Sequence, residues 1–200
     1  MKTVTGLLHI HTTYSYDGRI TLDDISSIAR SKGHGFLLLT EHSDDFSPRK
    51  MEALCEHCER LSGDDFLVIP GLEVDCDFGR HLLAVGVSEY ISEGSPEEVV
   101  RQIADQGGLA ILPHPSVYQF RSFLPSAGDL NGVEVWNCRY DTRHAPNPKS
   151  FSLLEKLRKE NPSVFAYGGQ DLHKRKDVDG LFLRLELKEL SAYAVLTELR

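Results

Sequence analysis

Short apolar runs recur along the chain, each bounded by glycine, proline or polar residues. Runs of about four to eight such residues are typical of buried β-strands. The predicted strands cover residues 6–11, 36–40, 66–72, 81–87, 109–113, 132–136, 164–168 and 181–187. Nothing between them reads as a linker, a repeat or a low-complexity segment, so we expect residues 1–200 to form a single domain.

Helical segments lie between many of these strands and begin at recognisable capping residues. The predicted helices begin after Thr21, Ser47, Ser95 and Asn147, and a fifth covers residues 191–200. Proline follows three of these capping residues, at the first helical position, where its missing N–H costs nothing. Asp24 adds a variant capping box to the first helix, and Gly33 is its stop signal.

Strands that alternate with helices imply parallel pairing, because parallel strands need long crossover connections. Two architectures satisfy this pattern, an open doubly wound sheet and a closed barrel. Neither GxGxxG nor GxxxxGK[ST] follows the first strand, so the usual nucleotide-loop argument for the open sheet is missing.

Composition and charge restrict the class of protein further. Of 200 residues, 40% are hydrophobic and 26% are charged, which is typical of a globular domain. The net charge of −8 disfavours long nucleic acid as a partner but leaves a short phosphorylated substrate open. No apolar run approaches a membrane span, the N-terminus lacks a signal-peptide core, and four cysteines are too few for a disulfide framework. We therefore expect a cytoplasmic protein that does not bind membranes.

Metal-ligand residue types gather where predicted strands end. They are His9, His11, His42, Glu73, His114, Asp171 and His173. In parallel α/β folds the carboxyl ends of the strands meet at one edge, so these side chains should converge. So many converging directions fit the mouth of a closed barrel better than the crevice of an open sheet.

The spacing of the first pair supports a metal site. His9 and His11 should share one face of their strand, roughly 6.6 Å apart, with Leu8 and Ile10 pointing toward the helices. His81 begins its strand instead of ending it, but a hairpin with a turn over 77–79 would return it to the same rim. Imidazole and carboxylate ligands without cysteine suit Zn, Mn or Fe(II), and their number exceeds one tetrahedral ion, which indicates two or three ions.

Seven fragments of the sequence, taken in order, resemble a known family. They are HIHTTYSYDG (9–18), TEH (40–42), GLE (71–73), HLLAVG (81–86), PHP (113–115), GVEVWN (132–137) and GGQDLH (168–173). In this order they resemble the PHP domain, the polymerase and histidinol phosphatase family. The resemblance covers nearly the whole chain and implies a distorted (β/α)7 TIM-like barrel that holds up to three divalent metals and hydrolyses phosphoesters.

The resemblance also implies three sets of metal ligands. The first ion would be held by His9, His11, Glu73 and Asp171; Glu73 would bridge to a second ion, held also by His81 and His114; and a third would be held by Asp17, His42 and His173. Asp17 stands where the family often has His, which implies a weaker third site. Glu41 stands where the family more often has Asp, although it is not an implied ligand.

Basic residues near these ligands are candidates for binding a substrate phosphate. Lys174, Arg175 and Lys176 follow His173 directly, and a solvated loop is the equal alternative for them. Arg19 and either Arg139 or Arg143 are weaker candidates.

These observations predict metal-dependent hydrolysis of a phosphomonoester, a nucleotide or a short oligonucleotide by metal-activated hydroxide. Glu73, Asp171 and His173 are the expected catalytic residues. Two alternatives stay open: hydrolysis of a C–N or C–O bond at the same site, as in amidohydrolases, and a non-catalytic metal-binding regulatory module.

Overall fold

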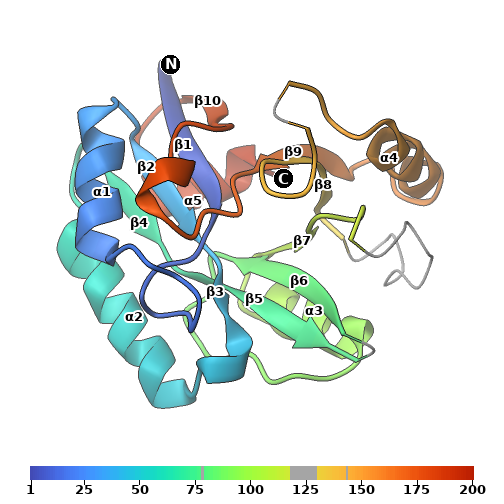
Figure 1. The fold of residues 1–200 in the computed structure, drawn as a ribbon, viewed down its shortest axis with the longest axis horizontal. Coiled ribbons are helices and arrows are strands. Elements are labelled where there is room, and N and C mark those ends of the chain that lie inside the picture. The colour runs from blue at the N-terminus through green and yellow to red at the C-terminus, as the bar shows by residue number, and fades with distance from the viewer. Residues whose placement is uncertain (78, 118–129, 143) are drawn as a thin grey trace.

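The computed structural model describes residues 1–77, 79–117, 130–142 and 144–200 (Figure 1). The strands are β1 (Lys2–Ile10), β2 (Phe36–Leu39), β3 (Glu41–His42), β4 (Leu67–Ile69), β5 (Gly71–Cys76), β6 (Arg80–Val85), β7 (Leu109–Leu112), β8 (Gly132–Asn137), β9 (Phe165–Gly169) and β10 (Leu183–Leu187). The α-helices are α1 (Leu22–Ser31), α2 (Pro48–Leu61), α3 (Pro96–Asp105), α4 (Pro148–Glu160) and α5 (Ala192–Glu198).

The helices begin where capping predicts. The side chains of Thr21, Ser47, Ser95, Asn147 and Ser191 each accept a hydrogen bond from a backbone N–H in the first turn of a helix. Each of these caps satisfies a donor that the helix itself leaves without a partner. None of the helices in the described ranges combines the length and the apolar character that crossing a membrane requires.

The strands form two sheets, in the orders β10-β1-β2-β4 and β3-β5-β6-β7-β8-β9. Pairing is parallel within β1-β2-β4, between β3 and β5, and within β7-β8-β9. It is antiparallel for β1–β10, β5–β6 and β6–β7, so the expectation of parallel pairing holds for only part of the fold. The β5–β6 pair is the hairpin that was predicted around His81.

The two sheets are joined at both ends. Thr40 alone separates β2 from β3, and Pro70 alone separates β4 from β5, so the chain passes directly from one sheet to the other. At the opposite ends, Leu172 N donates to His9 O at 3.0 Å and His11 N donates to Leu172 O at 2.8 Å. A mixed α/β fold is therefore confirmed, and closure into a seven-stranded barrel stays a prediction.

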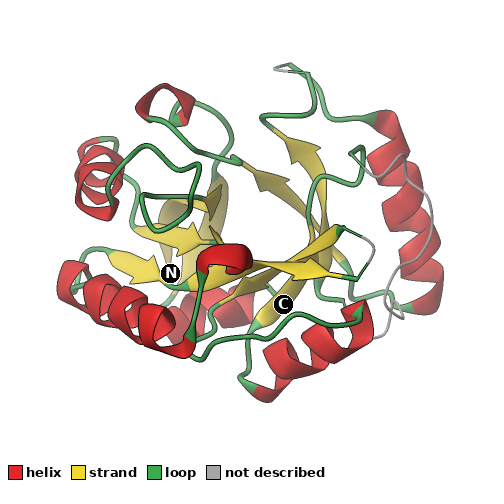
Figure 2. Cartoon of the chain, turned by 60° about the horizontal axis from the view of Figure 1, so that its bottom comes forward, coloured by secondary structure: helices red, strands yellow, loops and turns green. Residues whose placement is uncertain are grey.

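Two apolar clusters surround the strands and fill the space between them. The outer cluster packs strand residues such as Leu37 and Leu82 against helices α1–α4, and Figure 2 shows these helices outside the strands. The inner cluster draws on strands of both sheets, among them Phe36 and Ile111, and includes Val195 of α5. Because α5 covers one end of the inner cluster, the opposite end is left for polar side chains.

The direction of Leu8 differs from the prediction. Ile10 packs in the outer cluster, as expected, whereas Leu8 packs in the inner one. The reason is His9, whose φ of 68° interrupts the extended backbone and shifts the β1–β2 register between Leu8 and Ile10. At this irregularity successive side chains no longer alternate between the two faces of the strand. Leu8, His9 and His11 therefore all point toward the inside of the fold.

Candidate metal centre

The nine predicted metal ligands come together at the end of the fold away from α5. Their side chains come from β1 and the loop after it, from β3, β5 and β6, and from the segments that follow β7 and β9. They are His9, His11, Asp17, His42, Glu73, His81, His114, Asp171 and His173. His81 reaches the cluster through the hairpin, where it lies opposite Asp75 on β5.

Four overlapping groups of these residues have donor atoms within 4.8 Å of one another. The groups are His9–His11–Glu73, His9–His114–Asp171, Glu73–His81–His114 and His11–Asp17–His42–His173. The third matches one predicted ligand set, and the fourth contains another with His11 added. The first two share His9 and together contain the remaining set.

Glu73 lies at the centre of the cluster and is 2% exposed. Its Oε1 lies 2.7 Å from His81 Nδ1 and 2.9 Å from His114 Nε2. Its Oε2 lies 3.2 Å from the Nε2 atoms of both His9 and His11. Each of the two carboxylate oxygens of Glu73 thus faces a different pair of histidines. Burial by itself opposes ionisation, but these histidines lower the pKa of Glu73 well below its usual value.

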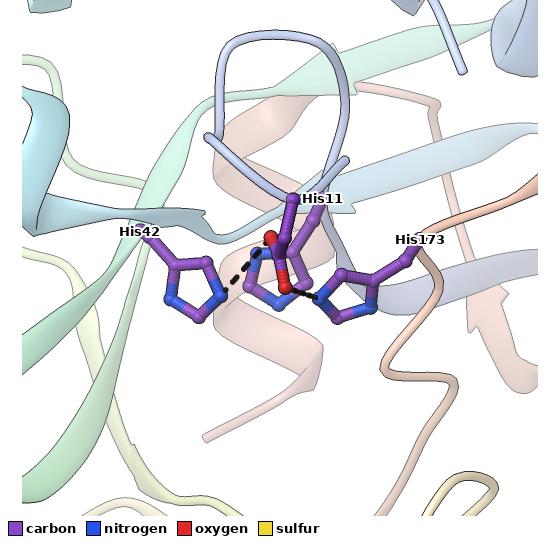
Figure 3. Close-up of side chains that lie close together, drawn as sticks. His11, His42 and His173 are labelled. Atoms are coloured by element: carbon purple, nitrogen blue, oxygen red, sulfur yellow. Dashed lines mark ion pairs between the residues drawn. The ribbon is translucent and has the colours of Figure 1, made fainter. Parts of the chain in front are cut away.

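The rings of His11, His42 and His173 form a second part of the cluster, with His11 between the other two (Figure 3). Both neighbouring rings stack on His11 with centroids 4.3 Å away. Asp17 bridges the outer rings, with Oδ1 3.4 Å from His42 Nε2 and Oδ2 2.9 Å from His173 Nε2.

The chemistry of this donor set fits divalent metal ions. His11 is fully buried, and its Nδ1 has no hydrogen-bond partner among the described residues. Burial lowers the pKa of His11 to about 3. Its ring is therefore neutral at ordinary pH and can offer a nitrogen lone pair to a metal ion. Six imidazoles and three carboxylates without a thiolate suit borderline or hard divalent ions.

Backbone strain is concentrated in three of these residues. Among the described residues other than glycine, a positive φ occurs at His9 (68°), His114 (27°) and Asp171 (50°), which form one of the four groups. Side chains with a Cβ rarely adopt this region, at a cost of about 1–3 kcal/mol each. The surrounding hydrogen bonds therefore hold the donor atoms together against local preference.

Glu134 is a buried carboxylate that the sequence analysis did not assign. Its Oε1 lies 2.7 Å from His9 Nδ1, and its Oε2 accepts from His114 N and Asn137 Nδ2, both at 2.9 Å. It therefore orients one strained histidine ring and anchors the backbone of another. The available signal was a single charged residue inside the apolar strand 132–136.

Glu41 plays a similar part on the other side of the cluster and is fully buried. Its carboxylate accepts hydrogen bonds from Thr12 N, Thr12 Oγ1 and Ser15 Oγ at 2.5–3.0 Å. Ser15 Oγ in turn accepts from His42 N at 2.9 Å. Burial raises the pKa of Glu41. Its hydrogen bonds fix the loop that carries Asp17.

The basic candidates lie at different distances from the cluster. Arg139 Nη1 lies 2.7 and 2.9 Å from the ring nitrogens of His173 and 3.7 Å from Asp171 Oδ1. Lys174 lines a cavity beside the cluster, and Arg175 is exposed in a short 3-10 helix. Arg19 is exposed, and its backbone N–H donates to His173 O at 2.7 Å. Arg143 lies outside the described residues.

Comparison with known proteins shows which folds and sequences this chain resembles. No family model matches the chain. A two-domain Bacteroides vulgatus protein containing a predicted PHP-like metal-dependent phosphoesterase has a TM-score of 0.73 and 20% identity, over 99% of this chain and 62% of that protein. The lesion-specific endonuclease PfuEndoQ of Pyrococcus furiosus has a TM-score of 0.68 and 18% identity, over 98% of this chain and 55% of that one. This chain thus spans less than two thirds of either protein.

The chain therefore has a PHP-like fold, with histidines and carboxylates clustered at one end of it. In sequence, the chain is 31% identical over 172 residues to the uncharacterized protein MJ1587 of Methanocaldococcus jannaschii, which covers 78% of this chain and 92% of that protein. The chain belongs to the same family as MJ1587.

Proposed function

We propose that the protein hydrolyses a phosphoester bond in a small phosphorylated substrate with the help of divalent metal ions. The observation that carries this proposal is the position of Glu73, whose two carboxylate oxygens face different histidine pairs. A carboxylate placed in this way suits a bridge between two ions. The phosphoesterase and endonuclease named among the structural neighbours support the same reaction class.

Three sets of residues would hold two or three ions of Zn, Mn or Fe. The first is His9, His11, Glu73 and Asp171; the second is Glu73, His81 and His114; and the third is Asp17, His42 and His173. Such ions, when bound, supply a nucleophile at neutral pH and neutralise charge on phosphate oxygens. Glu73 and Asp171 act by fixing the ligand geometry.

Arg139 and His173 are placed to act on the substrate itself. The Arg139 guanidinium lies against the His173 ring, so it can donate to an equatorial phosphate oxygen at the edge of the cluster. The His173 ring can hold a proton for the leaving group when it is not serving as a ligand. Lys174 and Arg175 add positive charge beyond it.

We also propose that residues 1–200 make one domain whose strands close into a distorted (β/α)7 barrel. The continuous passage of the chain through Thr40 and Pro70, and the hydrogen bonds of Leu172 with β1, support closure. The inner apolar cluster, which draws on both sheets, supports a single domain.

The test is elemental analysis of the purified protein together with a phosphate-release screen. The substrates are p-nitrophenyl phosphate, bis(p-nitrophenyl) phosphate and a nucleotide panel, each with added Mn²⁺ or Zn²⁺. We expect two or three ions per chain and metal-dependent release. Bound metal without release from any substrate would instead favour an amidohydrolase or a regulatory module, and a chain that takes up no metal would overturn the proposal.

A further inference from the structure

A cavity of about 760 Å³ opens beside the metal centre. It shares Arg139, Asp171 and His173 with that centre, and the rest of its lining comes from residues 136–141 and 170–181. Cavities that hold small molecules commonly have volumes of about 300–1,000 Å³. A phosphate at the metal centre would therefore leave this cavity for the remainder of the substrate.

Three carboxylates that line the cavity each have a partner on at least one oxygen. Asp177 Oδ2 accepts from the backbone N–H groups of His173 and Lys174 at 3.3 and 3.1 Å. Asp141 Oδ2 accepts from Asn137 N at 2.9 Å, and Asp179 pairs with Lys32 at 2.5 Å. Asp141 Oδ1 and Gln170 Oε1 have no hydrogen-bond partner among the described residues.

Two basic side chains of the lining, unlike these carboxylates, have no ion-pair partner among the described residues. Lys174 and Lys176 are exposed and form no ion pair with any described residue. Arg139 lines the same cavity and contacts His173 and Asp171, with 45% of its side chain exposed. The two lysines, which lack an ion-pair partner, therefore favour an anionic group in their part of the cavity.

The apolar part of the cavity lining suits the organic part of a substrate. Trp136 and Leu181 line the cavity, and the indole N–H of Trp136 is taken by Thr142 O at 3.0 Å, which leaves its ring to pack. A flat or cyclic group between the metal centre and the two lysines would contact this wall.

We propose that the cavity binds a second anionic group, a phosphate or a carboxylate, carried by the leaving group of the substrate. The inference rests on the proposed function and narrows its substrate class to small organic phosphoesters with two separated negative groups. Lys174 and Lys176 receive the second group, and Arg139, which contacts His173, receives the first.

Three matched substrates test this proposal: phenyl phosphate, 4-carboxyphenyl phosphate and benzene-1,4-diyl bisphosphate. For the metal-loaded protein we expect kcat/KM to be about tenfold or more higher for at least one of the doubly anionic substrates than for phenyl phosphate. The better of the two identifies the second group as carboxylate or phosphate. The double variant Lys174→Gln/Lys176→Gln should lose this preference, whereas Lys188→Gln, an exposed lysine outside the cavity, should keep it.

Binding of non-hydrolysable phosphonates separates this proposal from the proposed function. By calorimetry, 4-carboxyphenylphosphonate or benzene-1,4-diphosphonate should bind more tightly than phenylphosphonate, and the double variant should abolish the difference. If that pattern holds but no ester is hydrolysed, the proposed function fails and the second-anion site stands. Equal affinities for all three phosphonates, or a preference that survives in the double variant, would overturn the site.

Discussion

His9 Nδ1 and Glu134 Oε1 lie 2.7 Å apart, and neither side chain is exposed. The bond places a ring proton on Nδ1, so when the ring is neutral the lone pair of Nε2, which faces Glu73, is available to a metal ion. Although burial opposes it, Glu134, Asp171 and Glu73 raise the pKa of His9 well above its usual value in the metal-free protein. Carboxylates behind a metal-binding histidine typically orient the ring and increase its basicity.

Replacing Glu134 by Gln should therefore weaken metal binding by a factor of about 10–100. The amide can keep the shape of the side chain, but it cannot satisfy all three of its present donors. Competition with a coloured chelator measures the affinity. Glu97→Gln removes an exposed glutamate on α3 and should leave the affinity unchanged; an equal affinity for Glu134→Gln would remove the role assigned to this residue.

Loss of a single implied ligand should abolish metal loading and turnover together. For His11→Ala and Asp171→Asn we expect activity to fall by a factor of about 10³ or more, with fewer ions per chain. Asparagine tolerates the left-handed backbone of position 171, so this variant should fold. Full turnover in either variant would refute the ligand assignment.

Glu41→Gln should disturb the third ligand set without touching it. The new amide NH2 group would face the N–H and hydroxyl donors of Thr12 and Ser15, which costs about 1–3 kcal/mol of folding free energy. We expect a lower metal count and faster proteolysis within residues 12–20, measured by elemental analysis and mass spectrometry. Glu52→Gln, an exposed change on α2, is the matched control. Wild-type metal content and protease resistance would contradict the expectation.

The stability contributed by His81 in the metal-free protein should depend on pH. Burial opposes its charged form, but hydrogen bonds with Asp75 and Glu73 raise the pKa of His81 to about 10. A raised folded pKa gives stability that is complete below about pH 6.5 and is lost as the pH rises toward 10. His81→Asn should therefore destabilise the protein more at about pH 6 than at about pH 9, by about 1 kcal/mol or more.

Urea unfolding in the presence of a chelator measures this difference. His144→Asn removes an exposed histidine and should show no such trend. An equal cost of His81→Asn at both pH values would contradict the assignment of the proton to this histidine.

The sequence predicts the elements well because capping residues and apolar runs are local signals. Thr21 and Ser95 cap their helices as expected, and the β5–β6 hairpin brings His81 to the site. The direction of Leu8 could not be predicted, because it depends on a strained backbone at His9 that only the packed site imposes.

The candidate site shows the same division between local and non-local information. The strand-end position of His9 and His114 is visible in the sequence, but the link that Glu134 makes between them is not. Glu134 and His9 are 125 residues apart, so their contact exists only after β1 and β8 have been placed. A single charged residue within an apolar strand is the only local sign of such a role.

The positive φ angles of His9, His114 and Asp171 have an evolutionary consequence. At each position, glycine or asparagine would fit the backbone better than the residue now present. A descendant that no longer needed the metal would gain stability by drifting to those residues, and would do so at all three positions. Under the proposed function, retention of His, His and Asp there marks continuing selection for metal binding, and their joint replacement in a relative would mark its loss.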